Sequence, residues 1–74
     1  MGDTVTVAER VISNLRDQRT AAGLTQAQLA EAAGVTRQTI IAIEKGNYTP
    51  SVLLALKLAR ILGTAVEELF AYGE

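Results

Sequence analysis

Arg37 and Gln38 are adjacent residues whose side chains can form paired hydrogen bonds with a planar partner. They directly follow Thr36, a residue type that commonly caps helix N-termini. The guanidinium of an arginine can donate two hydrogen bonds to guanine O6 and N7, and a glutamine amide can pair with adenine N6 and N7. At an exposed helix start, such a pair has the chemistry to read base edges. The alternative stays open on chemistry alone, because an arginine on a helix face is more often simply solvated.

An isoleucine lies among the polar residues of the same predicted helix. Three apolar residues share the side of this helix that can face a core: Val35, Ile40 and Ile43. Ile41 falls on the opposite side, one turn after Arg37, so the two side chains point the same way. If Arg37 enters a major groove, Ile41 can pack against the C5-methyl of a thymine. Two other interpretations stay open, an isolated apolar surface residue and a contact with another protein.

The composition excludes most enzyme classes. The 74 residues include no cysteine and no histidine. Disulfides and thiolate zinc sites are therefore absent, as are the usual general base and the commonest metal ligand. Without these residues, and with few carboxylates that could converge, we expect no catalytic site, no metal and no cofactor.

The net charge of −1 conceals an uneven distribution. Between residues 10 and 45 the basic residues are Arg10, Arg16, Arg19, Arg37 and Lys45, and the acidic ones are Asp17, Glu31 and Glu44. The acidic balance of the whole chain argues against a general nucleic-acid coat, but this segment permits a local basic face. No apolar run reaches the length of a membrane span, and no signal-peptide pattern is present, so we expect a cytoplasmic protein without a membrane partner.

Capping signals divide the chain into five predicted helices. A threonine followed three residues later by Glu or Gln forms a capping box at Thr6, Thr25 and Thr64. Thr36 can cap another helix, and Thr49 with Pro50 forms an N-cap and first-position pair. The predicted helices span about 6–22, 25–33, 36–45, 49–62 and 64–70. With no credible β pattern, we expect one all-α domain over residues 1–74.

The second and third predicted helices have the spacing of a helix-turn-helix. Gly34 between them can adopt the left-handed conformation that a tight turn needs. Leu29 on the first helix can face Ile40 and Ile43 on the second, and the small Ala33 lets the helices approach closely. This packing would leave the outer side and the N-terminal end of the second helix free.

The residues NLRDQRTAAGLTQAQLAEAAGVTRQTIIAIEKGNYTPS, followed by LALKLARILGTAVEELF, cover about four-fifths of the chain. This stretch resembles the lambda-repressor and Cro-like helix-turn-helix family, also called the xenobiotic-response-element family. The signatures GLTQ, LA, AGV, RQTI, IEKG and TPS stand in the family's order and spacing. The resemblance implies a five-helix bundle in which helices two and three, about Gln26 to Ala33 and Arg37 to Lys45, form the DNA-binding unit.

The resemblance also implies roles for single residues. It places base contacts at Arg37, Gln38 and Ala42, and DNA-backbone contacts at Gln26, Lys45, Asn47 and Tyr48. Ala42 and Tyr48 could serve packing instead. Ile41 is added to the base contacts because of its position one turn after Arg37. A lysine, a tyrosine hydroxyl and a helix N-terminus can each bind phosphate, which suits the predicted backbone contacts. The family pattern pairs Glu44 with Arg19, since a carboxylate near a buried face needs a partner; Arg16 could contact phosphate or be solvated.

These features predict a sequence-specific, double-stranded DNA-binding transcriptional regulator, acting as a dimeric repressor. A two-fold dimer places two recognition helices one helical turn, about 34 Å, apart on a palindromic operator. Leu53, on the otherwise polar face of helix four, and Tyr72 are the candidates for the homodimer interface, whereas Phe70 suits the core. The alternative is a protein-interaction module or antitoxin-like partner, which the acidic balance and an exposed Ile41 and Leu53 favour.

Overall fold

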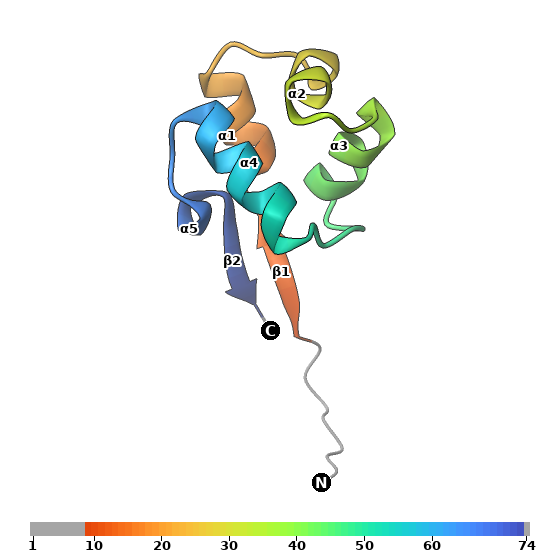
Figure 1. Ribbon diagram of the computed structural model, residues 1–74. Helices are drawn as coiled ribbons and strands as arrows, with labels where there is room; N and C mark the ends of the chain where they lie inside the picture. Colours follow the sequence, from red (N-terminus) through yellow and green to blue (C-terminus); the bar gives the residue numbers. More distant parts are fainter. Residues whose placement is uncertain (1–8, 74) are drawn as a thin grey trace, which may run out of the picture.

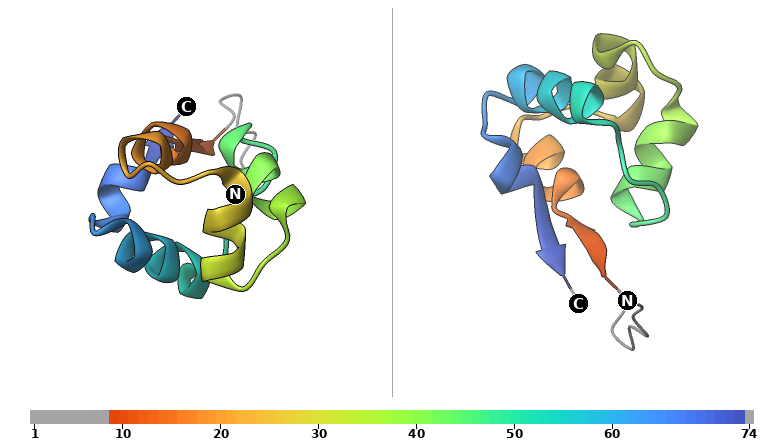
Figure 2. Two further views of the ribbon diagram at one scale, coloured as in Figure 1. Left: turned by 90° about the horizontal axis from the view of Figure 1, so that it is seen from above. Right: turned by 60° about the horizontal axis from the view of Figure 1, so that its bottom comes forward.

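Five short helices and two strands make up the computed structural model, which describes residues 9–73 (Figure 1). In chain order they are β1 (Arg10–Ser13), α1 (Leu15–Ala21), α2 (Gln26–Ala33), α3 (Arg37–Glu44), α4 (Val52–Leu62), α5 (Val66–Leu69) and β2 (Phe70–Gly73). The helices form a bundle with α3 and α5 on opposite sides, and the strands extend from one end of it (Figures 1 and 2). No described helix is both long and apolar enough to cross a membrane.

A two-stranded sheet makes the all-α prediction wrong in one respect. β1 and β2 pair antiparallel, with Val11 opposite Tyr72 and Ile12 opposite Ala71. The β-branched side chains of β1 suit an extended strand, but they can form one only beside a partner. That partner lies at the other end of the described chain, so no local sequence pattern shows it.

The first predicted helix is consequently too long. Residues 10–13 are extended, and α1 begins at Leu15 instead of near residue 6. Asn14 marks the change, because its backbone N–H donates to the Leu69 carbonyl at 2.7 Å, one residue beyond the paired strands. The predicted capping residue Thr6 lies outside the described residues.

The starts of α2 and α3 confirm the capping predictions. The Thr25 hydroxyl accepts from the Gln28 N–H at 3.0 Å, and the Gln28 side chain accepts from the Thr25 N–H at 2.8 Å. The Thr36 hydroxyl accepts from the Thr39 N–H at 3.2 Å. Between the two helices, Gly34 has a φ of +74°, the left-handed conformation that the tight turn requires.

The predicted start of α4 is wrong by two residues. Ser51, not Thr49, is the N-cap, and its hydroxyl accepts from the Leu54 N–H at 3.1 Å. Pro50 therefore precedes the helix and does not occupy its first turn. Both hydroxyl residues of the TPS sequence can cap a helix, and the choice depends on where the packed helix must begin.

The last helix also starts later than predicted. Its N-cap is Ala65, and the Glu68 carboxylate accepts from the Ala65 N–H at 3.4 Å and from the Thr64 hydroxyl. The box predicted between Thr64 and Glu67 is therefore wrong, because the adjacent glutamate performs that role. The helix ends at residue 69, after which the chain turns extended into β2.

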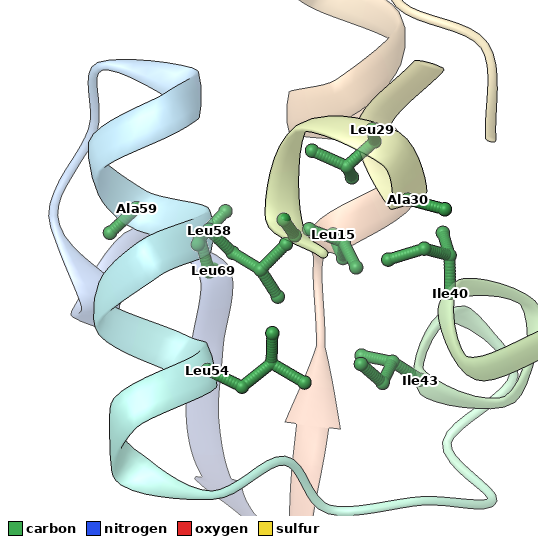
Figure 3. Packing of buried hydrophobic residues seen from close by; sticks show 10 residues of the cluster. Leu15, Leu29, Ala30, Ile40, Ile43, Leu54, Leu58, Ala59 and Leu69 are labelled. Atoms are coloured by element: carbon green, nitrogen blue, oxygen red, sulfur yellow. The ribbon is translucent and has the colours of Figure 1, made fainter. Parts of the chain in front are cut away.

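The core is aliphatic and lies between the helices (Figure 3). Its buried members are Leu15, Leu29, Ala30, Ala33, Ile40, Ile43, Leu54, Leu58, Ala59 and Leu69. Ile40 and Ile43 fix the inner side of α3 against α2 and α4, as their spacing predicts (Figure 3). The packing that holds α3 in place therefore leaves its opposite side facing outward.

Candidate nucleic-acid interface

An open groove runs between the start of α2 and the outer side of α3. Four predicted DNA-contact residues line it: Gln26, Arg37, Ile41 and Lys45. Arg37 and Lys45 are exposed, whereas Gln26 and Ile41 are half-buried in the groove wall. The structure thus brings cationic, amide and apolar side chains from two helices into one concave surface, which suits a polyanion with readable base edges.

The other predicted contact residues lie outside the lining of this groove. They are Gln38, Ala42, Asn47 and Tyr48. Gln38 is exposed beside Arg37 at the start of α3, and Ala42 is half-buried. The Asn47 N–H donates to the Ala42 carbonyl at 2.9 Å, which ties the loop after α3 to the helix.

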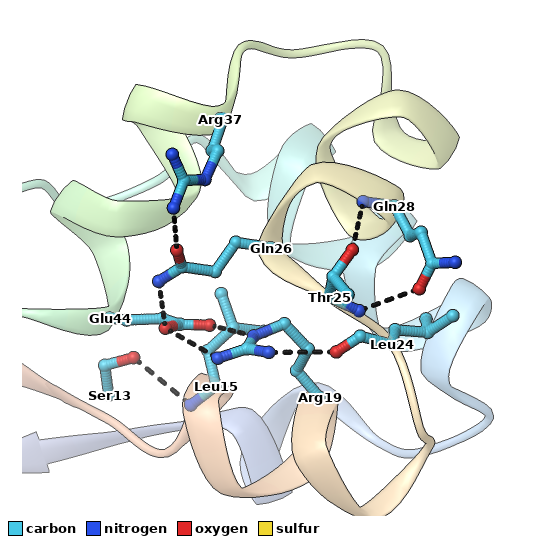
Figure 4. A network of polar contacts seen from close by, with 9 residues as sticks. All are labelled: Ser13, Leu15, Arg19, Leu24, Thr25, Gln26, Gln28, Arg37 and Glu44. Carbon is cyan, nitrogen blue, oxygen red and sulfur yellow. Dashed lines mark hydrogen bonds and ion pairs between the residues drawn. The ribbon is translucent and has the colours of Figure 1, made fainter.

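Arg19 and Glu44 form the ion pair that links α1 to the end of α3 (Figure 4). Arg19 Nε lies 2.5 Å from Glu44 Oε2, Arg19 Nη2 lies 3.2 Å from Oε1, and Nη1 donates to the Leu24 carbonyl at 2.9 Å. The side chains are only 12% and 5% exposed. Two parallel N–H···O bonds of this kind fix both position and orientation, so the pair sets the angle at which α3 stands against α1.

Glu44 stays ionised in this setting. Burial by itself would raise the pKa of its carboxyl, but hydrogen bonds from Arg19 and Gln26, with the charges of Arg19 and Arg16, hold that pKa below its ordinary value of 4.5. The hydrogen bond to Glu44 in turn raises the pKa of Arg19. The groove floor therefore carries a fixed carboxylate that its neighbours neutralise.

Gln26 joins this ion pair to the predicted base-reading arginine (Figure 4). Its Nε2 donates to Glu44 Oε1 at 3.0 Å, and its Oε1 accepts from Arg37 Nη2 at 3.3 Å. Reasoning from the sequence missed both bonds, because the partners lie 18 and 11 residues away and no local spacing relates them. Arg16 and Thr20 of α1 also line the groove. The sequence leaves Arg16 open between a phosphate contact and a solvated side chain, and it contains no signal that points to Thr20.

The geometry defines a helix-turn-helix protein with an exposed second helix and a partly cationic groove beside it. Residues 15–69 match the helix-turn-helix family model. The chain belongs to this family, in its Cro/C1 type, which confirms the resemblance read from the sequence. It is a DNA-binding transcription regulator and not an enzyme.

Relatives of similar length support the assignment. An HTH-type transcriptional regulator of Methanothermobacter thermautotrophicus is 54% identical over 61 residues, which are 81% of this chain and 88% of that protein. The regulator MJ0272 of Methanocaldococcus jannaschii is 50% identical over 62 residues, covering 84% of this chain and 94% of that one. The crystal structure of the restriction-modification controller protein C.AhdI from Aeromonas hydrophila aligns with a TM-score of 0.70 at 41% identity, covering 76% and 85% of the two chains.

Proposed function

We propose that this regulator reads a specific double-stranded DNA site by inserting α3 into the major groove. The observation that carries the proposal is the outward side of α3, where Arg37 and Gln38 stand exposed at the helix start and Ile41 follows in the groove wall. Arg37 pairs with a guanine, Gln38 with an adenine, and Ile41 and Ala42 meet apolar base edges.

Backbone contacts flank this reading helix. Gln26 stands at the N-terminus of α2, where backbone N–H groups without a partner inside the helix suit a phosphate. The Gln26 side chain uses one hydrogen of its NH₂ group for Glu44, and the second can bind the same phosphate. Lys45 and Asn47 follow α3 directly, and Tyr48 is 48% exposed in the same loop. Contacts of this kind set the register of a helix on the duplex without reading sequence.

The proposed active form is a homodimer on a palindromic operator. α4 exposes three apolar side chains at its start, Val52, Leu53 and Leu56, at 77%, 68% and 55%, and β2 exposes Tyr72 at 68%. Neither element carries a proposed DNA contact, so a two-fold interface here leaves both α3 helices free. A dimer bound across two half-sites would occlude a promoter, and we assign it a repressor role in the cytoplasm, where such DNA lies.

Selection from random duplexes, run beside sedimentation of the protein, tests this proposal. We expect enrichment of an inverted repeat with half-sites one helical turn apart, and a sedimenting dimer. Transcription from a promoter carrying the enriched site should fall when the protein is added. Recovery of no preferred sequence would contradict the proposal.

Lys45→Ala should weaken binding to every duplex alike. A phosphate contact carries no sequence information, so the ratio of affinities for selected and scrambled duplexes should stay constant while both affinities fall. The slope of log affinity against log salt should become shallower by about 1 per protomer. Fluorescence anisotropy at several salt concentrations measures both quantities. Lys57→Ala, a matched change on α4, should leave the slope as it is; equal slopes for the wild type and the Lys45 variant would remove Lys45 from the backbone contacts.

Leu53→Glu should shift the protein from dimer towards monomer. A carboxylate in an apolar two-fold interface is buried without a partner and meets its own copy across the axis. Operator affinity should fall with it, because the second half-site is no longer tethered. Sedimentation velocity at micromolar concentration gives the oligomeric state, and Ala32→Glu, at an exposed position of α2, is the control. If the Leu53→Glu variant remains a dimer, Leu53 lies outside the interface. If the wild type is a monomer that binds a different protein, the alternative function of a protein-interaction module gains support.

Ile41→Ser should abolish sensitivity to one thymine methyl. The Ile41 side chain cannot read a hydrogen-bond pattern, but it can shed water against a C5-methyl. We expect replacement of thymine by uracil at one position per half-site to cost the wild type about 1 kcal/mol, from roughly 25 cal/mol per Å² of buried apolar surface. The serine variant should not distinguish the two bases. A wild type that is indifferent to every thymine-to-uracil change would rule out the methyl contact.

A further inference from the structure

The Gln26 amide occupies a place between two groups of opposite hydrogen-bonding character. On one side lies the Glu44 carboxylate, 3.0 Å from Gln26 Nε2, and on the other the Arg37 guanidinium, with Nη2 3.3 Å from Gln26 Oε1 (Figure 4). Gln26 is half-buried and Arg37 is exposed. The amide therefore connects a fixed part of the bundle to a side chain that would otherwise sample many rotamers in solvent.

The direction of this chain of bonds is set by Glu44. An ionised carboxylate only accepts hydrogen bonds and a guanidinium only donates them. Arg19 donates to both oxygens of the Glu44 carboxylate and keeps it ionised. Gln26 must therefore turn its NH₂ group towards Glu44 Oε1 and its oxygen towards Arg37. A reversed amide would set oxygen against carboxylate and NH₂ against guanidinium, two repulsive contacts in place of two attractive ones.

We propose that Gln26 is a positioning residue for Arg37, and that selectivity at the base pair read by Arg37 depends on Glu44 through the Gln26 amide. The proposal rests on the function above, in which Arg37 reads DNA. The bond to Gln26 uses one of five guanidinium donors and leaves four for a base. Ordering the arginine before DNA arrives removes part of the entropy cost of binding, a gain of about 2- to 10-fold per side chain.

This role differs from the phosphate contact already assigned to Gln26. Loss of a phosphate contact lowers the affinity for all duplexes equally, whereas loss of positioning lowers only the discrimination at one base pair. The two contributions are separable in one experiment, because the discrimination is a ratio from which a uniform loss cancels.

A double-mutant cycle with Gln26→Met and Arg37→Ala tests the proposal. Affinities are measured for the selected duplex and for a duplex changed only at the guanine that Arg37 reads. Gln26→Met should lower the ratio of these affinities by about 2- to 10-fold in the wild-type background and leave it unchanged in the Arg37→Ala background. Gln28→Met, which loses a hydrogen bond only to the Thr25 backbone, should leave the ratio unaltered. An unchanged ratio in Gln26→Met would overturn the proposal.

Two further measurements separate this proposal from the function on which it rests. Glu44→Gln keeps the shape of the side chain but lets it donate as well as accept, so Gln26 is no longer oriented; the ratio should fall as in Gln26→Met, in samples shown by urea unfolding to be folded. In the free protein, NMR relaxation of the Arg37 Nε–H should show greater mobility in both variants. If the wild type selects no duplex, the proposed function has failed, and the NMR measurement alone tests whether Gln26 positions Arg37. An Arg37 side chain that is as ordered in Gln26→Met as in the wild type would then refute the positioning.

Discussion

Alanine at both Arg37 and Gln38 is expected to reduce binding of the selected site almost to the level of a scrambled duplex. Each bidentate pair with a base discriminates by about 1–3 kcal/mol, so the loss of two such pairs in each protomer removes most of the specificity. Both residues are exposed, and neither contributes to the buried core, so the fold should survive the change. Competition binding at fixed salt measures the ratio of specific to scrambled affinity.

The single substitutions refine this expectation. Arg37→Ala should relax selection at one base pair of each half-site and Gln38→Ala at a neighbouring one, which repeated selection from random duplexes would show. Residual affinity should keep the salt dependence of the wild type, because the phosphate contacts remain. If the double variant selects the same site as the wild type, the assignment of α3 as the reading helix is wrong.

Removal of one partner from the Arg19–Glu44 pair should have the largest effect on stability. Arg19→Ala leaves the Glu44 carboxylate, only 5% exposed, without its main counter-charge, at a cost of about 3–5 kcal/mol. A domain of this size has a total stability of about 4–11 kcal/mol, at 0.05–0.15 kcal/mol per residue. We therefore expect a variant that is close to unfolding at room temperature. Urea unfolding followed by circular dichroism measures the difference.

The matched control replaces both partners by methionine. Arg19→Met with Glu44→Met removes both charges and fills a similar volume, so it should cost much less than either single change. This result would show that the single variants fail because they strand a buried charge. A cost below about 1 kcal/mol for Arg19→Ala would place the pair among weak surface ion pairs instead.

The pH dependence of stability follows from the same carboxyl. The pKa of Glu44 is lower in the folded state than its ordinary value of 4.5, so the unfolded state takes up a proton first as the pH falls. The contribution of Glu44 is fully present above that ordinary value and is lost as the pH falls through the folded pKa. Unfolding free energies measured between pH 7 and pH 3 should decline less steeply below pH 4.5 in Glu44→Gln than in the wild type.

Local signals were sufficient where a residue and its partner lie close in sequence. The capping box of Thr25, the turn at Gly34 and the inward side of α3 at Ile40 and Ile43 all follow from neighbours within one or two helical turns. The family pattern added the distant pairing of Arg19 with Glu44, which periodicity could not supply.

Distant partners explain what the sequence did not predict. β1 is extended because β2 lies beside it, and without that knowledge Ile12 also fits the apolar stripe of a helix. The contacts of Gln26 could not be predicted for the same reason, since its partners Glu44 and Arg37 are distant in sequence and only the fold brings them near it. The starts of α4 and α5 differ from the prediction for other reasons. At α4 both Thr49 and Ser51 can cap, and tertiary packing selects the later one. At α5 the N-cap is Ala65, which has no capping side chain, and Glu68 instead of Glu67 accepts from its N–H.

The central claim is that Arg37 reads a guanine in the major groove. Its most direct test measures the affinity for the selected duplex after each guanine in turn is replaced by 7-deazaguanine. This base keeps its pairing and loses only the N7 acceptor, which faces the major groove. We predict that the wild type loses affinity at one guanine in each half-site and that Arg37→Ala is indifferent at that position. A wild type unaffected by every replacement, or an Arg37→Ala variant with the same sensitivity as the wild type, would contradict the account.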